Sequence, residues 1–311
     1  MRIHAVDGTY ELYRAHYSKR PRKFAPRPSG PGKTEGMDVT ATLGLVASLL
    51  ALLADRSEAV THLAYAFDNP IRSFRNDLFE GYKDDSGVPP ELAAQFDLVE
   101  ELVTSLGVTV LRMVEFEADD ALATLASAFP SAEVRILSPD KDLAQCLEGS
   151  RVVTVDRSRQ RSVSEADFLA SRGFSPSLVP DFLALTGDPQ DGIPGLNGFG
   201  DKTASALLAL FGPLERIPDD PSAWPSSVRG RERLAATLAS RREDAALYKR
   251  LATLIRDVPL GLAPGDLQVP SSLPASFEVA ALALGAENLA ARARDVFAAR
   301  AALGSQPGLA R

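Results

Sequence analysis

Nine acidic residues occupy five short motifs of this sequence: VDG, FDN, EADD, DKD and GDPQD. They are Asp7, Asp68, Glu117, Asp119, Asp120, Asp140, Asp142, Asp188 and Asp191. Taken singly, each motif has a structural explanation. EADD favours the positive end of a helix dipole, DKD suits a turn or a helix cap, and GDPQDG has the composition of a turn. If the motifs converge, however, so many like charges cannot all stay ionised without a compensating cation.

Converging carboxylates select hard divalent cations. Oxygen-only ligands favour Mg²⁺ or Mn²⁺, and the three histidines, at positions 4, 16 and 62, are too scattered to indicate a zinc site. One Mg²⁺ usually keeps several waters, so more than four carboxylates predict two ions, about 3.5–4 Å apart. Such a pair suits in-line displacement at a phosphodiester: one ion lowers the pKa of the attacking water and the other stabilises the leaving oxygen.

A glycine-rich stretch, GLNGFGDKT, follows the last acidic motif. It is similar to a phosphate-binding P-loop, but Asp201 shifts Lys202 out of register, and the preceding segment has the pattern of a helix and a turn rather than a buried strand. The stretch fits instead the hairpin of a helix–hairpin–helix, with a helix starting near Lys202. The tight turn would be formed by Gly195, Gly198 and Gly200. Backbone amides, Lys202 and Thr203 would then meet phosphate; the simpler alternative is a turn that only joins two helices.

The elements that must position these residues alternate between strands and helices. Strands are predicted at 2–6, 62–67, 108–114, 133–137 and 151–155, and helices at 39–54, 91–106 and 117–129. This alternation predicts an α/β fold with a mostly parallel sheet. Asp7, Asp68 and Asp140 each follow a predicted strand, where sites form in such sheets. Short helices are expected from about residue 164 to 256, and the segment from 260 has no clear pattern.

Composition and charge bound the class of protein. The chain has 311 residues, 45% hydrophobic and 24% charged, with one cysteine and no apolar run of membrane-spanning length. The N-terminus lacks the layout of a signal peptide, so we expect a cytoplasmic protein. The net charge is −7, yet residues 14–33 hold seven basic and no acidic side chains. This flexible basic loop, with Arg20, Arg22 and Lys23, either contacts a phosphate backbone or is simply solvated.

Five motifs in the same order resemble the 5′-nuclease family. They are VDGTYELYRAHY, FDNPIRSFRNDLFEGYK, FEADDALATLA, RILSPDKDLAQ and LTGDPQDGIPGLNGFGDKTA. The family includes the 5′→3′ exonuclease domains of bacterial DNA polymerases and the flap endonucleases, which share a PIN-like core. The resemblance covers about residues 2–211 and, more weakly, 247–260. Since no polymerase segment follows, we expect the stand-alone form, a monomer, with a DNA polymerase acting in trans.

The resemblance implies roles for individual residues. Ligands of the first metal would be Asp7, Asp68 and Asp119, and those of the second Glu117, Asp140, Asp142 and Asp191, with Asp142 bridging. Asp120 and Asp188 would lie in the outer shell. Lys83 matches the catalytic lysine, which stabilises charge on the scissile phosphate. Tyr82 would stack a terminal base, and Arg72 and Arg75 would contact the 5′-terminal phosphate.

The same resemblance implies a domain plan. We expect a PIN-like catalytic core over 1–180, with the basic loop at 18–36 and a helical gateway at 80–106 through which single-stranded 5′ ends pass. A helical DNA-binding region would follow over 181–260, with the helix–hairpin–helix at about 192–212 and a potassium ion held there by main-chain oxygens. The tail, 261–311, is left unplaced.

This chain departs from the family pattern in three places. Asp84 and Asp85 follow Lys83 where relatives often carry another basic residue, which weakens backbone attraction there. The basic loop is longer and more basic than usual. Gly192 stands where asparagine is common, so no side-chain hydrogen bond from this position orients Asp191.

The expected function is therefore metal-dependent hydrolysis of DNA with 5′ ends or 5′ flaps, leaving a 5′-phosphate and a 3′-hydroxyl. The alternatives are a non-catalytic binder of DNA structures, a PIN-type ribonuclease and, taking the glycine-rich stretch literally, a nucleotide-binding protein. Exonuclease and endonuclease preferences arise from one site, and the sequence leaves them open.

Overall fold

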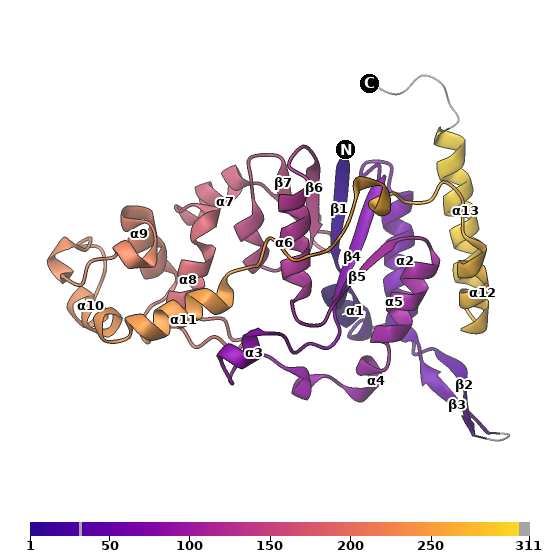
Figure 1. Ribbon diagram of the computed structural model, residues 1–311, viewed down its shortest axis with the longest axis horizontal. Helices are drawn as coiled ribbons and strands as arrows, with labels where there is room; N and C mark the ends of the chain where they lie inside the picture. The colour runs from indigo at the N-terminus through magenta and orange to yellow at the C-terminus, as the bar shows by residue number, and fades with distance from the viewer. Residues whose placement is uncertain (31–32, 305–311) are drawn as a thin grey trace. The chain divides into compact units, whose positions relative to one another are not determined.

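The computed structural model describes residues 1–30 and 33–304, and the chain divides into two compact units (Figure 1). The first unit comprises Met1–Asn69, Ser86–Met113 and Pro259–Arg311, and the second Pro70–Asp85 and Val114–Val258. Each unit is described by itself below. Among the described residues, no helix combines the length and the apolar character that a membrane crossing requires.

The first unit is built on three parallel strands. They are β1 (Arg2–Asp7), β4 (His62–Asp68) and β5 (Thr109–Met113), in the order β5-β4-β1. In the register of β1 and β4, Ile3 lies opposite His62 and Asp7 opposite Ala66. Both strands are buried along nearly their whole length, which explains their continuous apolar character.

Helices cover this part of the sheet. α1 (Gly8–His16) packs on α2 (Thr40–Ala54), which in turn packs on α5 (Phe96–Ser105). The sequence of α2, TATLGLVASLLALLA, is rich in leucine and alanine, both strong helix formers, and apolar on all sides, as expected for a largely buried helix. The helix predicted at 91–106 is divided into α4 (Pro90–Ala93) and α5.

The basic segment forms a hairpin where an irregular loop was expected. β2 (Phe24–Gly30) pairs with β3 (Lys33–Asp38) in antiparallel fashion, with Phe24 opposite Asp38 and Ala25 opposite Met37. The Pro/Gly-rich composition hid this pairing, because a two-stranded ribbon consists only of edges, where proline is tolerated. Residues 31–32, between the two strands, lie outside the described residues.

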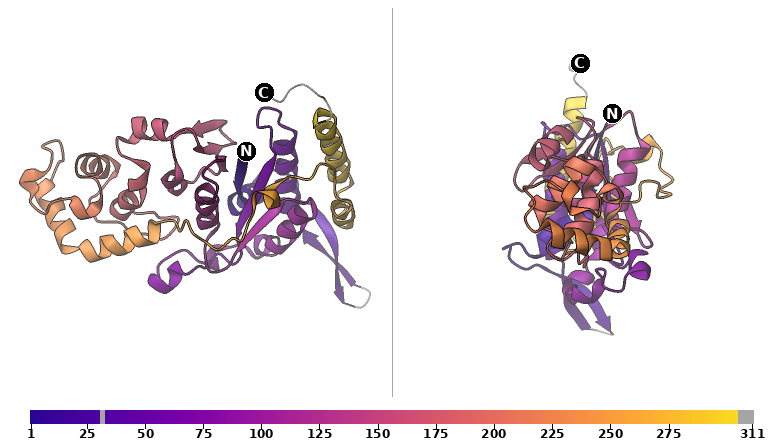
Figure 2. Two further views of the ribbon diagram at one scale, coloured as in Figure 1. Left: turned by 45° about the horizontal axis from the view of Figure 1, so that its top comes forward. Right: turned by 90° about the vertical axis from the view of Figure 1, so that its left-hand side faces the viewer.

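The C-terminal tail, left unplaced from the sequence, packs on the first unit up to residue 304. It contains η6 (Pro264–Leu267), α12 (Ala275–Ala283) and α13 (Glu287–Gly304). α12 packs on α5, and α13 packs on α2 (Figures 1 and 2). The guanidinium of Arg300 donates to the carbonyls of Leu53 and Val60, at 3.1 and 2.8 Å. These bonds join the last helix to the end of α2.

The second unit combines a small sheet with a helical region. β6 (Glu133–Leu137) and β7 (Val152–Asp156) are parallel, and β8 (Arg161–Val163), too short to be recognised in the sequence, pairs with β7 in antiparallel fashion. The helices are α3 (Arg75–Leu78), α6 (Ala118–Ala128), α7 (Glu165–Arg172), α8 (Val179–Thr186), α9 (Asp201–Phe211), α10 (Arg231–Ser240) and α11 (Arg242–Ala252). Short 3-10 turns lie at η1 (Asp85–Gly87), which runs from this unit into the first, and at η2 (Asp142–Cys146), η3 (Pro176–Leu178), η4 (Leu214–Arg216) and η5 (Pro221–Ala223).

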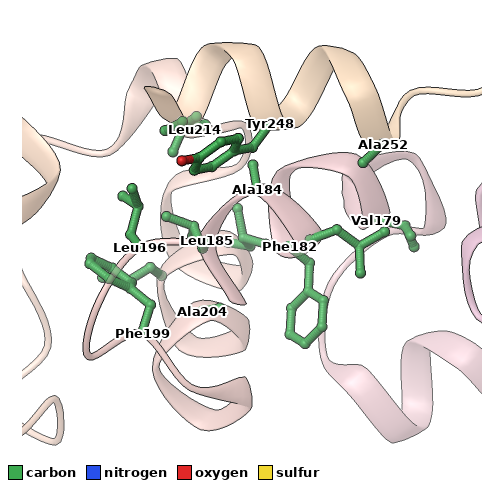
Figure 3. Packing of buried hydrophobic residues seen from close by; sticks show 14 of the residues in the cluster. Val179, Phe182, Ala184, Leu185, Leu196, Phe199, Ala204, Leu214, Tyr248 and Ala252 are labelled. Carbon is green, nitrogen blue, oxygen red and sulfur yellow. The ribbon is translucent and has the colours of Figure 1, made fainter. Parts of the chain in front are cut away.

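An apolar core fixes the helical region. α8 packs against α9 and α11, and Figure 3 shows Phe182, Leu185, Leu196, Phe199 and Tyr248 gathered in this core. Burying one such side chain stabilises the fold by roughly 1.5–3 kcal/mol. The predicted α/β fold, with a mostly parallel sheet followed by a helical region, is confirmed.

Candidate metal centre and catalytic site

Three carboxylates of the second unit meet in one cluster. Asp142 begins η2, after β6, while Asp188 and Asp191 lie in the loop after α8. One oxygen from each lies within 4.8 Å of the others. Asp142 and Asp188 are 4% and 2% exposed, so water screens their charges poorly. The structure thus brings DKD and GDPQD together, and it places Asp188, expected in an outer shell, with Asp142 and Asp191.

The electrostatics of Asp142 favour a cation in this cluster. Its Oδ1 is buried and has no hydrogen-bond partner among the described residues. Burial raises the pKa of Asp142 well above its ordinary value, and neighbouring carboxylates, Asp140 first among them, raise it further. Asp140 is adjacent, since its Oδ1 accepts a 2.8 Å hydrogen bond from the amide of Asp142. An unpartnered oxygen among carboxylates fits a hard divalent ion.

Lys141 is a member of the site that the sequence reasoning missed. Its Nζ lies 2.9 Å from Oδ2 of Asp188. Burial alone would lower the pKa of Lys141, but the hydrogen bond and charge of Asp188 raise it. Its place between the two aspartates of DKD was the signal that could have identified it.

Lys83 links the cluster to Glu117. Its Nζ lies 2.9 Å from Oδ1 of Asp191 and 3.0 Å from Oε2 of Glu117. Burial would raise the pKa of Glu117, but the ammonium of Lys83, followed by the guanidinium of Arg75, holds it below its ordinary value. Ser73 donates a 2.6 Å hydrogen bond to the other oxygen of Glu117. Glu117 is thus held ionised beside Lys83.

The backbones of the GYK and GDPQDG segments are in direct contact. The amide of Lys83 donates to the carbonyl of Asp191 at 3.1 Å. Gly192 has φ +75°, and a Cβ built there would lie 2.0 Å from the carbonyl oxygen of Gly81. Only glycine fits this approach. The backbone therefore orients Asp191, which answers the concern that Gly192 supplies no side-chain hydrogen bond.

Tyr82 does not have the exposed ring that base stacking needs. It is 4% exposed, and its hydroxyl donates to Oε2 of Glu117 at 3.2 Å and to Oδ2 of Asp191 at 3.4 Å. Because the ring is buried in the apolar core, this geometry does not support the stacking role expected from the sequence. The hydroxyl positions two carboxylates instead.

Arg75 also differs from its expected role. It is 1% exposed, and its guanidinium holds Asp120 with two bonds of 2.7 and 2.8 Å. Its other donors reach Glu117 at 3.1 Å and the carbonyls of Leu251 and Thr253 at 2.8 and 3.0 Å. No N–H remains for a phosphate, so the geometry does not support a phosphate contact. Arg75 joins α3 to α6 and to the end of α11.

Asp120 and Arg72 differ from each other in how far their polar groups are available to a ligand. Asp120 is fully buried, and besides Arg75 it accepts from the amides of Glu117 and Ile255, so its oxygens are occupied by the protein. Arg72 is exposed and forms a 3.4 Å ion pair with Asp77, which solvent weakens. The phosphate role of Arg72 stays a prediction, and Asp120 acts on the site through Glu117.

Asp7 and Asp68 lie in the first unit, at the carboxyl ends of neighbouring parallel strands. Asp7 caps α1, its Oδ1 accepting from the amide of Tyr10 at 2.8 Å, and the amide of Asp68 donates to Oγ1 of Thr9 at 2.8 Å. Asp119 lies in the first turn of α6, in the second unit. Their roles as first-metal ligands stay predictions.

The predicted hairpin joins α8 to α9. Gly195 and Gly198 have φ of +67° and +91°, and a Cβ on Gly195 would lie 2.4 Å from the amide nitrogen of Gly187. Gly200 differs from the expectation, because its φ of −109° suits any residue and nothing crowds it. It caps α9, which begins at Asp201. Lys202 is exposed.

The comparisons with known proteins identify the family. The model of the 5'-3' exonuclease, N-terminal resolvase-like domain, matches residues 2–173, more than half of the chain. The model of the 5'-3' exonuclease, C-terminal SAM fold, matches residues 174–274. The chain belongs to the 5′-3′ exonuclease family. This is a family of nucleases, and the resemblance expected from the five motifs is confirmed.

Several curated relatives of this 5′-3′ exonuclease family member are DNA polymerases. DNA polymerase I of Mycobacterium tuberculosis (strain H37Rv) is 36% identical over 275 residues, 85% of this chain and 28% of that protein. DNA polymerase I of Bacillus caldotenax is 34% identical, covering 84% of this chain and 29% of that protein. The thermostable DNA polymerase I of Thermus thermophilus is 33% identical over 87% and 30%. The chain thus spans less than a third of these relatives.

Solved structures show the same fold as this exonuclease family member. A structure of the T5 D15 protein with metal ions matches with a TM-score of 0.62 at 17% identity, covering 96% of this chain and 100% of that one. T5 5'-exonuclease with bound zinc gives a TM-score of 0.63 at 18% identity over 96% and 100%. The catalytic core of Rad2 in complex with DNA substrate gives 0.62 at 14% identity over 96% and 92%. These likenesses confirm the PIN-like fold.

Proposed function

We propose that this chain is a metal-dependent 5′-nuclease that hydrolyses DNA at 5′ ends or 5′ flaps, leaving a 5′-phosphate and a 3′-hydroxyl. The observation that carries the proposal is the buried cluster of Asp142, Asp188 and Asp191, in which Asp191 forms an ion pair with Lys83. Family membership supports the same reaction class. DNA as the substrate is in keeping with the relatives, which are DNA polymerases, and with Rad2, whose structure holds DNA.

The acidic residues fit a site for Mg²⁺ or Mn²⁺. Asp142, Asp188 and Asp191 offer only oxygen ligands, and the unpartnered Oδ1 of Asp142 lacks the counter-charge that an ion supplies. We propose that the site holds two ions. Glu117 and Asp140 would join this cluster as ligands of the second ion. The first ion, as the resemblance implies, takes Asp7, Asp68 and Asp119. Bound ions would activate the attacking water and stabilise the leaving oxygen.

The chain's own residues prepare the site for phosphate. Lys83 is partly exposed, and its ammonium neutralises Glu117 and Asp191 in this structure. With ions bound to these carboxylates, the ammonium of Lys83 would be available to stabilise charge on the scissile phosphate. Tyr82 holds the same carboxylates in place, and Arg72 offers an exposed guanidinium for a 5′-terminal phosphate. The deprotonated state of Glu117 keeps Lys83 close to the cluster.

The hairpin between α8 and α9 is proposed to bind the duplex backbone. The amides at the start of α9, with Lys202 and Thr203, would meet phosphates without reading bases, and main-chain oxygens of the turn would hold a potassium ion. Lys202→Ala should weaken duplex binding and lower the slope of log affinity against log salt by about 1. Its Mg²⁺ affinity should be unchanged; a variant that loses Mg²⁺ binding contradicts this assignment.

Product mapping on labelled DNA tests the reaction. End-labelled 5′-flap, nicked and gapped duplexes are incubated with wild type and Asp140→Asn in Mg²⁺, with Asp257→Asn as an exposed control carboxylate outside the cluster. We expect 5′-phosphate products from wild type and the control, and none from Asp140→Asn. An RNA strand in parallel separates this function from a PIN-type ribonuclease. Flap binding without cleavage by wild type would indicate a non-catalytic binder.

A DNA polymerase is the proposed partner of this chain. Because the relatives join this region to a polymerase, we propose that a DNA polymerase extends the 3′-hydroxyl beside the cleaved flap. We also propose that the chain acts as a monomer in the cytoplasm. Size measurement in solution tests the monomer directly.

A further inference from the structure

The first unit contains a cavity far along the chain from the acidic motifs of the second unit. Its volume is about 340 Å³. Three segments line it: Arg20, Pro21 and Lys23 of the basic loop, the N-terminal half of α2, and residues from 285 to 292 at and before the start of α13. The floor is apolar, formed by residues such as Leu43 and Ala47 of α2 and Leu289 of α13. The tail of the chain therefore completes a pocket that begins in the basic segment.

The charges around this cavity are unbalanced. Arg20, Lys23 and Arg292 line it, and none of the three side chains forms an ion pair or a hydrogen bond with another described residue. One carboxylate, Glu287, lies in the same lining. Three cations around one cavity repel one another, and an anion relieves that repulsion. This cavity is referred to below as the cationic pocket.

Neighbouring arginines that do not line the pocket are already paired. Arg22, two residues from Arg20, lies 2.9 Å from Oδ2 of Asp38. Arg294, two residues from Arg292, lies 2.9 Å from Oε1 of Glu278. Both the segment around Arg20 and helix α13 therefore carry a paired arginine outside the pocket. Arg20, Lys23 and Arg292 thus differ from the paired arginines that lie one or two residues away.

Glycine and a helix terminus shape the pocket for an anion. A Cβ built on Gly44 would lie 3.1 Å from Cβ of Ala15 and 3.3 Å from Nη1 of Arg20, so the guanidinium lies close to the surface of α2 at this glycine. On the other wall, α13 begins at Glu287, and the positive end of its dipole faces the same space. Two guanidinium groups and an ammonium offer the charge-assisted hydrogen bonds that phosphate oxygens accept.

The two matched family models cover only part of this pocket. The C-terminal family match ends at residue 274, whereas α13 begins at Glu287. The wall that carries Arg292 is therefore outside the matched region. The basic segment alone gives an open surface, and only the packing of α13 on α2 encloses it.

We propose that the cationic pocket binds a backbone phosphate of the DNA substrate. The inference rests on the proposed function for the identity of the ligand. DNA fits better than a free anion because Arg20, Lys23 and Arg292 are exposed to solvent, and Lys19, next to Arg20 in the chain, is a further exposed cation. The C-terminal helix thereby contributes to substrate binding.

A pair of variants on one helix tests the proposal. Arg292→Ala removes a pocket cation, and Arg294→Ala removes an equal charge that is paired outside the pocket. Affinity for a fluorescent 5′-flap duplex is measured by anisotropy in EDTA over a range of salt concentrations. We expect Arg292→Ala to bind about threefold to tenfold more weakly, with the salt slope lowered by about 1, and Arg294→Ala to match wild type.

The outcomes separate this inference from the proposed function. Equal affinities for wild type and both variants, or equal losses in both variants, overturn the pocket. If wild type fails to cleave flaps yet Arg292→Ala alone weakens binding, the pocket stands and the nuclease assignment falls. Inorganic phosphate is the second probe, followed by thermal denaturation. Saturable stabilisation of wild type that Arg292→Ala abolishes, with DNA affinity unchanged, replaces DNA by a small anion and overturns the proposal.

Discussion

Replacing Asp142 by asparagine tests whether the acidic cluster is built for a cation. Carboxylate oxygens of Asp188 and Asp191 lie within 4.8 Å of its own. At an effective dielectric constant of about 20, two unit charges at that distance repel by about 3.5 kcal/mol. Lys141 on Asp188 and Lys83 on Asp191 offset part of this repulsion. We therefore expect Asp142→Asn to stabilise the metal-free protein by about 1–2 kcal/mol at pH 8.

The pH dependence has a definite sign. The pKa of Asp142 is raised in the folded protein, first by burial and then by neighbouring carboxylates. The folded state therefore holds its proton more tightly than the unfolded chain, whose aspartate pKa is about 3.9. The associated stability is present below that value and is lost as pH rises through the folded pKa. The advantage of Asp142→Asn should accordingly be largest at pH 8 and shrink toward pH 5.

Thermal denaturation of EDTA-treated protein measures this effect. A gain of 1–2 kcal/mol corresponds to a Tm increase of roughly 2–8 °C for a protein of this size or somewhat smaller. Added Mg²⁺ or Mn²⁺ should then raise the Tm of wild type and have little effect on Asp142→Asn. Asp257→Asn serves as the exposed control. The reasoning is refuted if Asp142→Asn is less stable than wild type without metal, or if metal stabilises both equally.

Three further substitutions probe the surroundings of the cluster. Lys83→Met should reduce cleavage by about 10²–10³-fold and yet tighten Mn²⁺ binding, because Glu117 loses a competing ammonium; weaker Mn²⁺ binding would contradict this. Arg75→Met should cost about 3–5 kcal/mol in urea unfolding, since it leaves Asp120 buried and unpaired; a loss below about 1 kcal/mol would disprove the pairing argument. Gly192→Ala should lower the free energy of unfolding by about 1–3 kcal/mol and lower the cleavage rate, because its Cβ overlaps the Gly81 carbonyl. A variant with wild-type stability and rate would argue against this backbone contact.

Much of the fold follows from the sequence, because strands and helices of the core carry strong periodic patterns. β6 has the predicted bounds, and β1, β4, β5 and β7 each lie within a residue or so of their predictions. The β2–β3 hairpin and α13 could not be predicted in the same way. The hairpin depends on backbone pairing that its composition conceals, and the placement of α13 depends on tertiary contacts with α2.

The membership of the acidic cluster was predictable, whereas the state of individual side chains was not. Charge type singled out the motifs DKD and GDPQD, and the resemblance to the 5′-nuclease family implied metal-ligand roles for Asp142 and Asp191. Burial separated Arg75 and Tyr82 from the phosphate and stacking roles expected of them, and sequence spacing carries no information on burial at that scale. Lys141 was overlooked because a lysine between two aspartates is also typical of a solvent-exposed turn.

Cleavage of a 5′-flap duplex is the most direct test of the nuclease assignment. Purified wild type and Asp142→Asn are incubated with end-labelled flap DNA at pH 8, with Mg²⁺ or with EDTA. The account predicts 5′-phosphate products only from wild type and only with Mg²⁺. Intact DNA in every reaction, or equal cleavage by Asp142→Asn, would contradict it.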